Sequence, residues 1–189
     1  MIFILSGPSG SGKTTLRDLL LKDRSVKNKF VKSVSFSTRP RRLGEKEGRD
    51  YFFVSREEFF TLKRTRKILE WTKYLGYYYG TKKELVENAL KKGKHVMLCL
   101  DFKGMRRLKK IYPKETKAIF IIPPSIKELH KRIKGRSLET KDEEIGRRVN
   151  LARKELENAS LYDFTLSNVN LKQAVKGLRD IVLKKSCLK

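Results

Sequence analysis

The glycine-rich stretch GPSGSGKT at residues 7–14 is the feature that most constrains how this chain can fold. It fits the pattern G-x-x-x-x-G-K-[ST] at every position. The apolar run before it predicts a strand at residues 2–6, and the amphipathic pattern after it predicts a helix at residues 13–22. Residues without bulky side chains let consecutive backbone N–H groups converge on an anion, and the N-terminus of the helix adds further N–H groups and the positive end of its dipole. The stretch therefore predicts a phosphate-binding loop between a strand and a helix.

Each residue of this loop is a candidate for binding the phosphates of a nucleotide, although the loop alone does not say which: Gly7, Pro8, Ser9, Gly10, Ser11, Gly12, Lys13 and Thr14. The Lys13 ammonium is expected to reach the β- and γ-phosphates, and the Thr14 hydroxyl is expected to be a Mg²⁺ ligand. A chance glycine-rich turn is the alternative. The strand-loop-helix context argues against it, because both flanking patterns are present.

The rest of the chain alternates between strand and helix patterns. Apolar runs at 95–101 and 118–123 are typical of strands buried on both faces, and a short strand is expected at 164–166. Helices are predicted at 125–134, 142–158 and 171–183. This alternation favours an α/β fold in which a parallel-sheet core carries helices on both faces.

Residues 33–80 differ from this core. They hold β-prone, aromatic-rich segments on either side of a capping box, Ser55 with Glu58, which predicts one short helix. We interpret the segment as a small, mostly β insertion within a single domain of 189 residues.

Charge and cysteine content limit the function classes. The chain carries 46 Lys and Arg against 21 Asp and Glu, a net charge of +25, which would suit a nucleic-acid partner. The basic residues are spread along the chain and no RNA-binding signature accompanies them, so a solvated basic surface is favoured. Cys99 and Cys187 lie far apart and suggest neither a zinc site nor a disulfide framework. No apolar stretch approaches the roughly 20 residues of a membrane span, and we expect a cytoplasmic protein, with homo-oligomerisation left open.

Polar residues of the insertion suggest a second anion site beside a base-binding site. Ser35, Arg39 and Arg42 lie close together in SFSTRPRR, and guanidinium groups suit bidentate binding of phosphate. Tyr51 and Tyr79 follow, and the Glu70 carboxylate can accept two N–H bonds from a base edge. Together these residues describe a mononucleotide pocket.

The sequence resembles the guanylate kinase family. The matching blocks run in family order from residue 5 to about residue 168: SGPSGSGKTTL, SVSFSTRPRRLGEKEGRDYFFVSREEF, ILEW, YYGT, LDFKG, IPPSIKEL.KRI.GR and YDFTLSN. The resemblance implies transfer of the γ-phosphoryl group of ATP to GMP, or to dGMP, with Mg²⁺. It also implies a core at 1–32, 81–124 and 156–189, a GMP-binding insertion at 33–80 and a helical lid at 125–155.

The resemblance also implies roles for individual residues. Ser35 and Thr81 would bind the guanine, Glu70 would accept from its N1 and 2-amino groups, and Asp101 would lie on the same GMP side. The GMP phosphate would be bound by Arg39, Arg42, Tyr51 and Tyr79. The lid would contribute Arg132, Arg136 and Arg148 as catalytic residues with Lys13, and Asn168 would lie beside the adenine of ATP.

One position departs from the family pattern, which reads L-D-I-D-x-x-G where this chain has LCLDFKG at 98–104. Cys99 replaces the first aspartate, which predicts that one charged contact is missing on the GMP side and that restoring an aspartate would lower the KM for GMP. Three other functions stay open from the sequence: a kinase of this fold with another phosphate acceptor, a catalytically silent binding domain, and a nucleic-acid binder.

Overall fold

The computed structural model describes residues 1–135 and 142–186. The candidate residue Arg136 and Cys187 lie outside the described residues.

A five-stranded parallel sheet forms the core. Its strands are β1 (Ile2–Ser6), β2 (Phe30–Lys32), β7 (His95–Cys99), β8 (Thr116–Ile122) and β9 (Phe164–Ser167), in the order β2-β7-β1-β8-β9. The first strand of the chain is thus the middle of the sheet, and the phosphate-binding loop leaves from its carboxyl end. The predicted α/β fold is confirmed.

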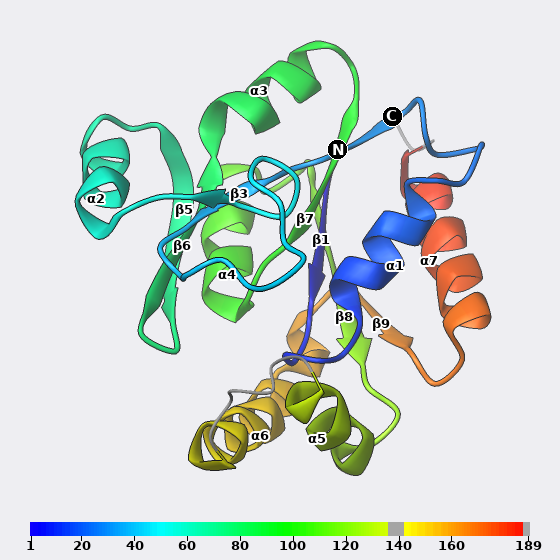
Figure 1. The fold of residues 1–189 in the computed structure, drawn as a ribbon. Helices are drawn as coiled ribbons and strands as arrows, with labels where there is room; N and C mark the ends of the chain where they lie inside the picture. Colours follow the sequence, from blue (N-terminus) through cyan, green and yellow to red (C-terminus); the bar gives the residue numbers. More distant parts are fainter. Residues whose placement is uncertain (136–141, 187–189) are drawn as a thin grey trace.

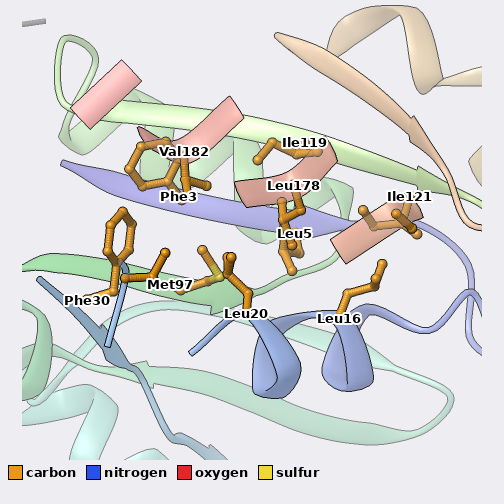
Figure 2. Packing of buried hydrophobic residues seen from close by; sticks show 12 residues of the cluster. Phe3, Leu5, Leu16, Leu20, Phe30, Met97, Ile119, Ile121, Leu178 and Val182 are labelled. Atoms are coloured by element: carbon orange, nitrogen blue, oxygen red, sulfur yellow. The ribbon is translucent and has the colours of Figure 1, made fainter. Parts of the chain in front are cut away.

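Helices cover both faces of this sheet (Figure 1). Successive side chains of β1 point to opposite faces, so Phe3 and Leu5 pack against α1 (Lys13–Leu20) and α7 (Leu171–Ser186). Figure 2 shows Leu16 and Leu20 of α1 and Leu178 and Val182 of α7 meeting these strand residues. Ile2 and Ile4 face the other way, toward α3 (Lys83–Lys91) and α4 (Phe102–Ile111).

The boundaries of two elements differ from the sequence prediction in a way that matters for the site. The strand expected at 95–101 ends at Cys99, and Asp101 instead forms the N-cap of α4, its Oδ1 accepting from the Gly104 amide at 2.8 Å. The helices α3 and α4 and the short edge strand β2 were not predicted. Both helices are amphipathic, with Val86 and Ala89 of α3 and Met105 and Leu108 of α4 buried, so their periodicity was present in the sequence and was overlooked.

A second, four-stranded sheet projects from the core. Its strands are β3 (Ser35–Ser37), β4 (Phe52–Phe53), β5 (Ile68–Tyr74) and β6 (Tyr77–Lys82), in the order β4-β3-β6-β5. The helix α2 (Arg56–Arg64) packs on it, and Ser55 caps this helix by accepting from the Glu58 amide at 3.0 Å, as the capping box predicted. The antiparallel register places Ser35 opposite Thr81 and Ser37 opposite Tyr79.

Two further helices lie below the carboxyl ends of the core strands in Figure 1. They are α5 (Ile126–Lys134), capped by Ser125, and α6 (Asp142–Glu157), which a short 3-10 helix (Ala159–Leu161) connects to β9. Leu129 and Ile133 of α5 pack against Ile145, Val149 and Ala152 of α6 in a cluster separate from the two sheet-face clusters. No helix in the described part of the chain is both long and apolar enough to cross a membrane.

Candidate active site

The glycine-rich loop forms a tight turn against the core. Gly7 and Gly12 have φ angles of 127° and 95°, which L side chains rarely adopt. A Cβ atom on Gly7 would lie 2.5 Å from the Ile121 carbonyl oxygen, and one on Gly12 would overlap Asn168 Nδ2. These two glycines are therefore required both for the backbone conformation and for the close approach of β8 and the segment after β9.

The N-terminus of α1 is open to a ligand. Gly12 is its N-cap and supplies no side-chain hydrogen bond, and the first turn contains no acidic residue. The unpaired amides of this turn suit a phosphate group. The Lys13 ammonium donates to the carbonyl oxygens of Gly7 and Pro8 at 2.5 and 2.8 Å, which holds the cation at the mouth of the loop.

Asn168 lies behind the loop. It is buried, and its Nδ2 donates to the Ser11 carbonyl oxygen at 2.8 Å. In this structure the Asn168 amide thus supports the loop backbone. The sequence-based assignment beside adenine stays a prediction.

A buried carboxylate, that of Glu70, lies in the second sheet. Glu70 is only 4 % exposed; its Oε1 accepts from the Thr81 hydroxyl at 2.5 Å, while its Oε2 has no hydrogen-bond partner among the residues that the structure describes. Burial, more than any neighbour, raises the pKa of Glu70 to about 7. An unpaired, buried carboxylate oxygen is costly unless a ligand supplies donors, and a purine edge with adjacent N–H groups would do so.

Asp101 completes this part of the site. Its Oδ2 accepts from the Thr72 hydroxyl at 2.8 Å, while its Oδ1 caps α4. Both carboxylate oxygens are thus fixed in position by the chain itself. Asp101, at the N-cap of α4, lies close to Glu70 of β5. Its negative charge helps to raise the pKa of Glu70, although burial has the larger effect.

Arginine and tyrosine side chains form the neighbouring anion site. Arg39 is buried, donates from Nη2 to both carboxylate oxygens of Glu45 at 2.7 and 2.9 Å, and lies 5.6 Å from the centre of the Tyr51 ring. Tyr51 in turn packs edge-on against Tyr79 at 5.8 Å. Burial raises the pKa of Tyr51 to about 12, so its hydroxyl keeps its proton and can donate to a phosphate.

The helix α6 brings another guanidinium group, that of Arg148, to the cavity that Arg39 and Arg42 line. Burial lowers the pKa of Arg42, and the positive charges of Arg39 and Arg148 lower it further. Three guanidinium groups from two separate parts of the chain therefore surround one space. A bound phosphate would relieve their mutual repulsion.

A cavity of about 460 Å³ connects these groups. Most of the sequence-predicted site residues line it: Gly7, Ser9, Gly10, Gly12, Lys13, Thr14, Ser35, Arg39, Arg42, Tyr51, Glu70, Tyr79, Asp101 and Arg148. Four others do not line the cavity, namely Pro8, Ser11, Thr81 and Asn168. Pro8 and Thr81 hydrogen-bond to the lining residues Lys13 and Glu70, whereas Asn168 bonds to Ser11 within the loop. Arg132 lies outside the lining and pairs with Glu128 along its own helix, Nε to Oε1 at 3.0 Å.

The structure adds lining residues that the sequence did not single out: Arg17, Thr72, Glu45 and Glu155. Within residues 1–135 and 142–186, Glu155 of α6 has a buried Oε2 without a hydrogen-bond partner, and burial raises its pKa to about 7 against the opposing effect of Lys13. In the sequence these residues lie among other charged side chains of helices and loops, and no local pattern distinguishes them from solvated ones.

These features define a class of protein. The core is a parallel sheet with a phosphate-binding loop. A second sheet carries a buried carboxylate, the arginines lie beside it, and residues of α6 complete the cavity. This is the architecture of a P-loop nucleoside monophosphate kinase.

The particular family follows from sequence and structure comparisons. The chain belongs to the guanylate kinase family: residues 1–185 match the family model described as guanylate kinase. It is 40 % identical over 187 residues to a guanylate kinase of Bacillus anthracis, covering 99 % of this chain and 89 % of that protein. It is also 40 % identical over 183 residues to a guanylate kinase of Bacillus subtilis (strain 168), covering 97 % and 88 %.

A solved structure agrees with this assignment. The crystal structure of guanylate kinase from Anaplasma phagocytophilum superimposes with a TM-score of 0.81 at 30 % identity, covering 99 % of this chain and 86 % of that one. The chain is accordingly an ATP:GMP phosphotransferase. The resemblance noted from the sequence is confirmed.

Proposed function

We propose that the cavity binds ATP on the glycine-rich loop and GMP on the second sheet, and that it transfers the γ-phosphoryl group directly between them. The observation that carries this proposal is the single cavity, which joins Lys13 and the open N-terminus of α1 to Glu70 and the Arg39–Arg42 site. ADP and GDP are the products.

On the donor side, the backbone amides of residues 7–14 bind the β- and γ-phosphates. Lys13 exchanges its present contacts with the Gly7 and Pro8 carbonyl oxygens for phosphate oxygens. Arg148 reaches the transferred group from the lid, which we assign to residues 125–155. Arg132 and Arg136 stay candidates for the same role, and Arg132 would have to leave Glu128 to fulfil it.

On the acceptor side, the ionised Glu70 carboxylate accepts from the guanine N1 and 2-amino groups, and Asp101 accepts a further base donor. Thr81 fixes Glu70, and Ser35 lies opposite Thr81 in the sheet register. Arg39, Arg42, Tyr51 and Tyr79 bind the GMP phosphate. Adenine lacks the adjacent N–H donors that Glu70 requires, so AMP leaves this carboxylate buried and unpaired.

The residues present fit a Mg²⁺ ion on the donor side. Thr14 supplies a hydroxyl to the cavity, and the unpartnered Oε2 of Glu155 is a hard oxygen near Lys13. We propose that Thr14 holds the ion, with the Glu155 carboxylate close by. The ion would neutralise charge on the phosphates of ATP.

The protein's contribution to the chemistry is positioning and charge neutralisation. The acceptor is a phosphate oxygen, which is already ionised, so no side chain has to remove a proton from it. Lys13, Arg42 and Arg148 surround the path of the transferred group, and the lid and second sheet exclude water that would otherwise hydrolyse ATP. We assign this activity to the cytoplasm, where both nucleotides are supplied.

A coupled assay of ADP release tests the proposal. With ATP and Mg²⁺ held constant, GMP should support rapid ADP release and AMP, CMP and UMP should not. Comparable rates with AMP and GMP would contradict the assignment of Glu70, and ADP release without any nucleoside monophosphate would indicate an ATPase.

A further inference from the structure

Arg17 is a buried arginine in the wall of the cavity, in the last turn of α1. Only 5 % of it is exposed. Its Nε donates to Asp18 Oδ1 at 2.9 Å, and its Nη1 lies 3.8 Å from Cys99 Sγ. Within the described residues Nη2 donates no hydrogen bond, so most of the donors of this guanidinium are unused.

The protein pairs only part of the Arg17 guanidinium. Burial opposes its charge, but Cys99 and Asp18 outweigh this and keep the pKa of Arg17 raised. Asp18 has a side chain that is 44 % exposed, so that pairing is screened by solvent, and the Cys99 thiol is a weak hydrogen-bond acceptor. Lys32 adds a second cation nearby, because its pKa is lowered by burial and then by the positive charge of Arg17. The remaining donors of Arg17, at the wall of the cavity, are therefore available to an anion bound there.

The position of Arg17 indicates which anion this is. Arg17 follows Lys13 by one helical turn, so both side chains lie on the same side of α1. Tyr51, which we assign to the GMP phosphate, lines the same cavity and contributes to the raised pKa of Arg17, after Cys99 and Asp18. Arg17 therefore lies between the glycine-rich loop and the acceptor anion site.

We propose that Arg17 is a substrate-binding residue that donates to the phosphate of GMP, and that Cys99 leaves its guanidinium available for this contact. The proposal rests on the assignment of the acceptor site above. It adds a third arginine to Arg39 and Arg42, one that comes from the core rather than from the insertion.

The proposal reverses the expectation for Cys99 that the sequence suggests. An aspartate at position 99 would lie against Arg17 Nη1 and would pair with it, because the thiol is already 3.8 Å away. The guanidinium would then be occupied, and the KM for GMP would rise rather than fall.

Equilibrium binding of GMP and of guanosine to the full chain separates a phosphate contact from a structural role. Arg17→Met should weaken GMP binding about tenfold or more, as expected for a lost charge-assisted hydrogen bond, and should leave guanosine binding unchanged. Arg17→Lys should restore part of the loss. Arg24→Met is the matched control, since Arg24 is exposed and its removal lowers the net charge equally; both affinities should stay at the wild-type value.

Equal loss of GMP and guanosine binding in Arg17→Met, or no loss of either, would overturn the proposal. Cys99→Asp gives a second test: a higher KM for GMP supports the role of Arg17, and a lower one contradicts it, with Cys99→Ser separating charge from size. A wild-type chain that binds GMP no better than AMP would instead refute the acceptor-site assignment, so the two failures are distinguishable.

Discussion

The donor and acceptor sides of the cavity are built in opposite ways. In the proposed function the donor side uses consecutive residues, 7–14, and their backbone amides are the groups assigned to the phosphates. The acceptor side uses side chains from β3, β5, β6, the 39–51 loop and the N-cap of α4. A local motif depends on its own sequence, whereas an assembled pocket depends on packing between distant segments. The donor side should therefore respond to changes within the loop, and the acceptor side to changes at residues that never touch the substrate.

The largest effect is expected on the donor side. Lys13→Ala removes the cation that faces the β- and γ-phosphates, and turnover should fall by about 100-fold or more, as for other groups that stabilise developing charge. The fold should persist, because the hydrogen bonds of Lys13 go to two carbonyl groups of the loop itself. Steady-state ADP release measures the turnover, and a thermal melt measures the stability of the fold. A variant that keeps most of the wild-type GMP-dependent turnover would refute the donor assignment.

On the acceptor side, Glu70→Gln should raise the KM for GMP about tenfold or more and leave the KM for ATP nearly unchanged. Because the pKa of Glu70 is raised to about 7 and only the ionised form accepts both guanine donors, the wild-type KM for GMP should fall as the pH rises through about 7. The variant should lose this pH dependence. Glu155 titrates in the same range, so a profile that is unchanged in Glu70→Gln would assign the titration to Glu155 instead.

The same carboxylate has a predictable effect on stability. Its pKa is higher in the folded chain than the ordinary 4.5, so the folded state holds a proton that the unfolded state has lost. The contribution of Glu70 to the free energy of unfolding should therefore decrease as the pH rises from about 4.5 to about 7. Thermal melts of the wild type and Glu70→Gln over this range should diverge, with the wild type losing more stability as the pH rises.

Gly104→Ala tests whether packing alone can disable the acceptor side. A Cβ atom there would lie 2.8 Å from Glu70 Oε2 and 3.3 Å from Asp101 Oδ1. Alanine favours the helix, so stability should change little, while displacement of Glu70 should raise the KM for GMP several-fold. An unchanged KM for GMP would mean that Glu70 tolerates displacement, which would contradict the fixed carboxylate described above.

The smallest effect is expected from Thr72→Val, a substitution of similar shape. It removes the hydroxyl that donates to Asp101 Oδ2 at 2.8 Å, a bond worth about 1.5–3 kcal/mol when one partner is charged. Asp101 keeps its bond to the Gly104 amide, so we expect a few-fold rise in the KM for GMP and no change in turnover at saturation. A fall in turnover with unchanged KM would place Asp101 in the chemical step rather than in binding.

The sequence by itself determined the glycine-rich loop and the central strands of the core. The loop at 7–14 carries its function in consecutive residues, and the periodicity of its neighbours fixes a strand and a helix around it. The strands β1, β7 and β8 were predictable for a related reason: strands buried on both faces are continuous apolar runs, which are visible without any partner. The sequence blocks shared with the guanylate kinase family identified the candidate acceptor residues. They did not give the positions of these residues relative to one another.

Only the tertiary structure decided how the acceptor side is held together. Thr81 hydrogen-bonds to Glu70, Thr72 hydrogen-bonds to Asp101, and Gly104 lies so close to Glu70 that a side chain would displace it. These pairs are separated by 11, 29 and 34 positions, so no local sequence pattern encodes them. The environment of Arg17 is the clearest case. In the sequence it is one of 46 basic residues, and its significance arises because folding buries its guanidinium beside a thiol at the wall of the cavity. Whether a side chain is buried, and which charges lie beside it, depends on which segments pack together. The order of the strands and their crossover connections determines that packing.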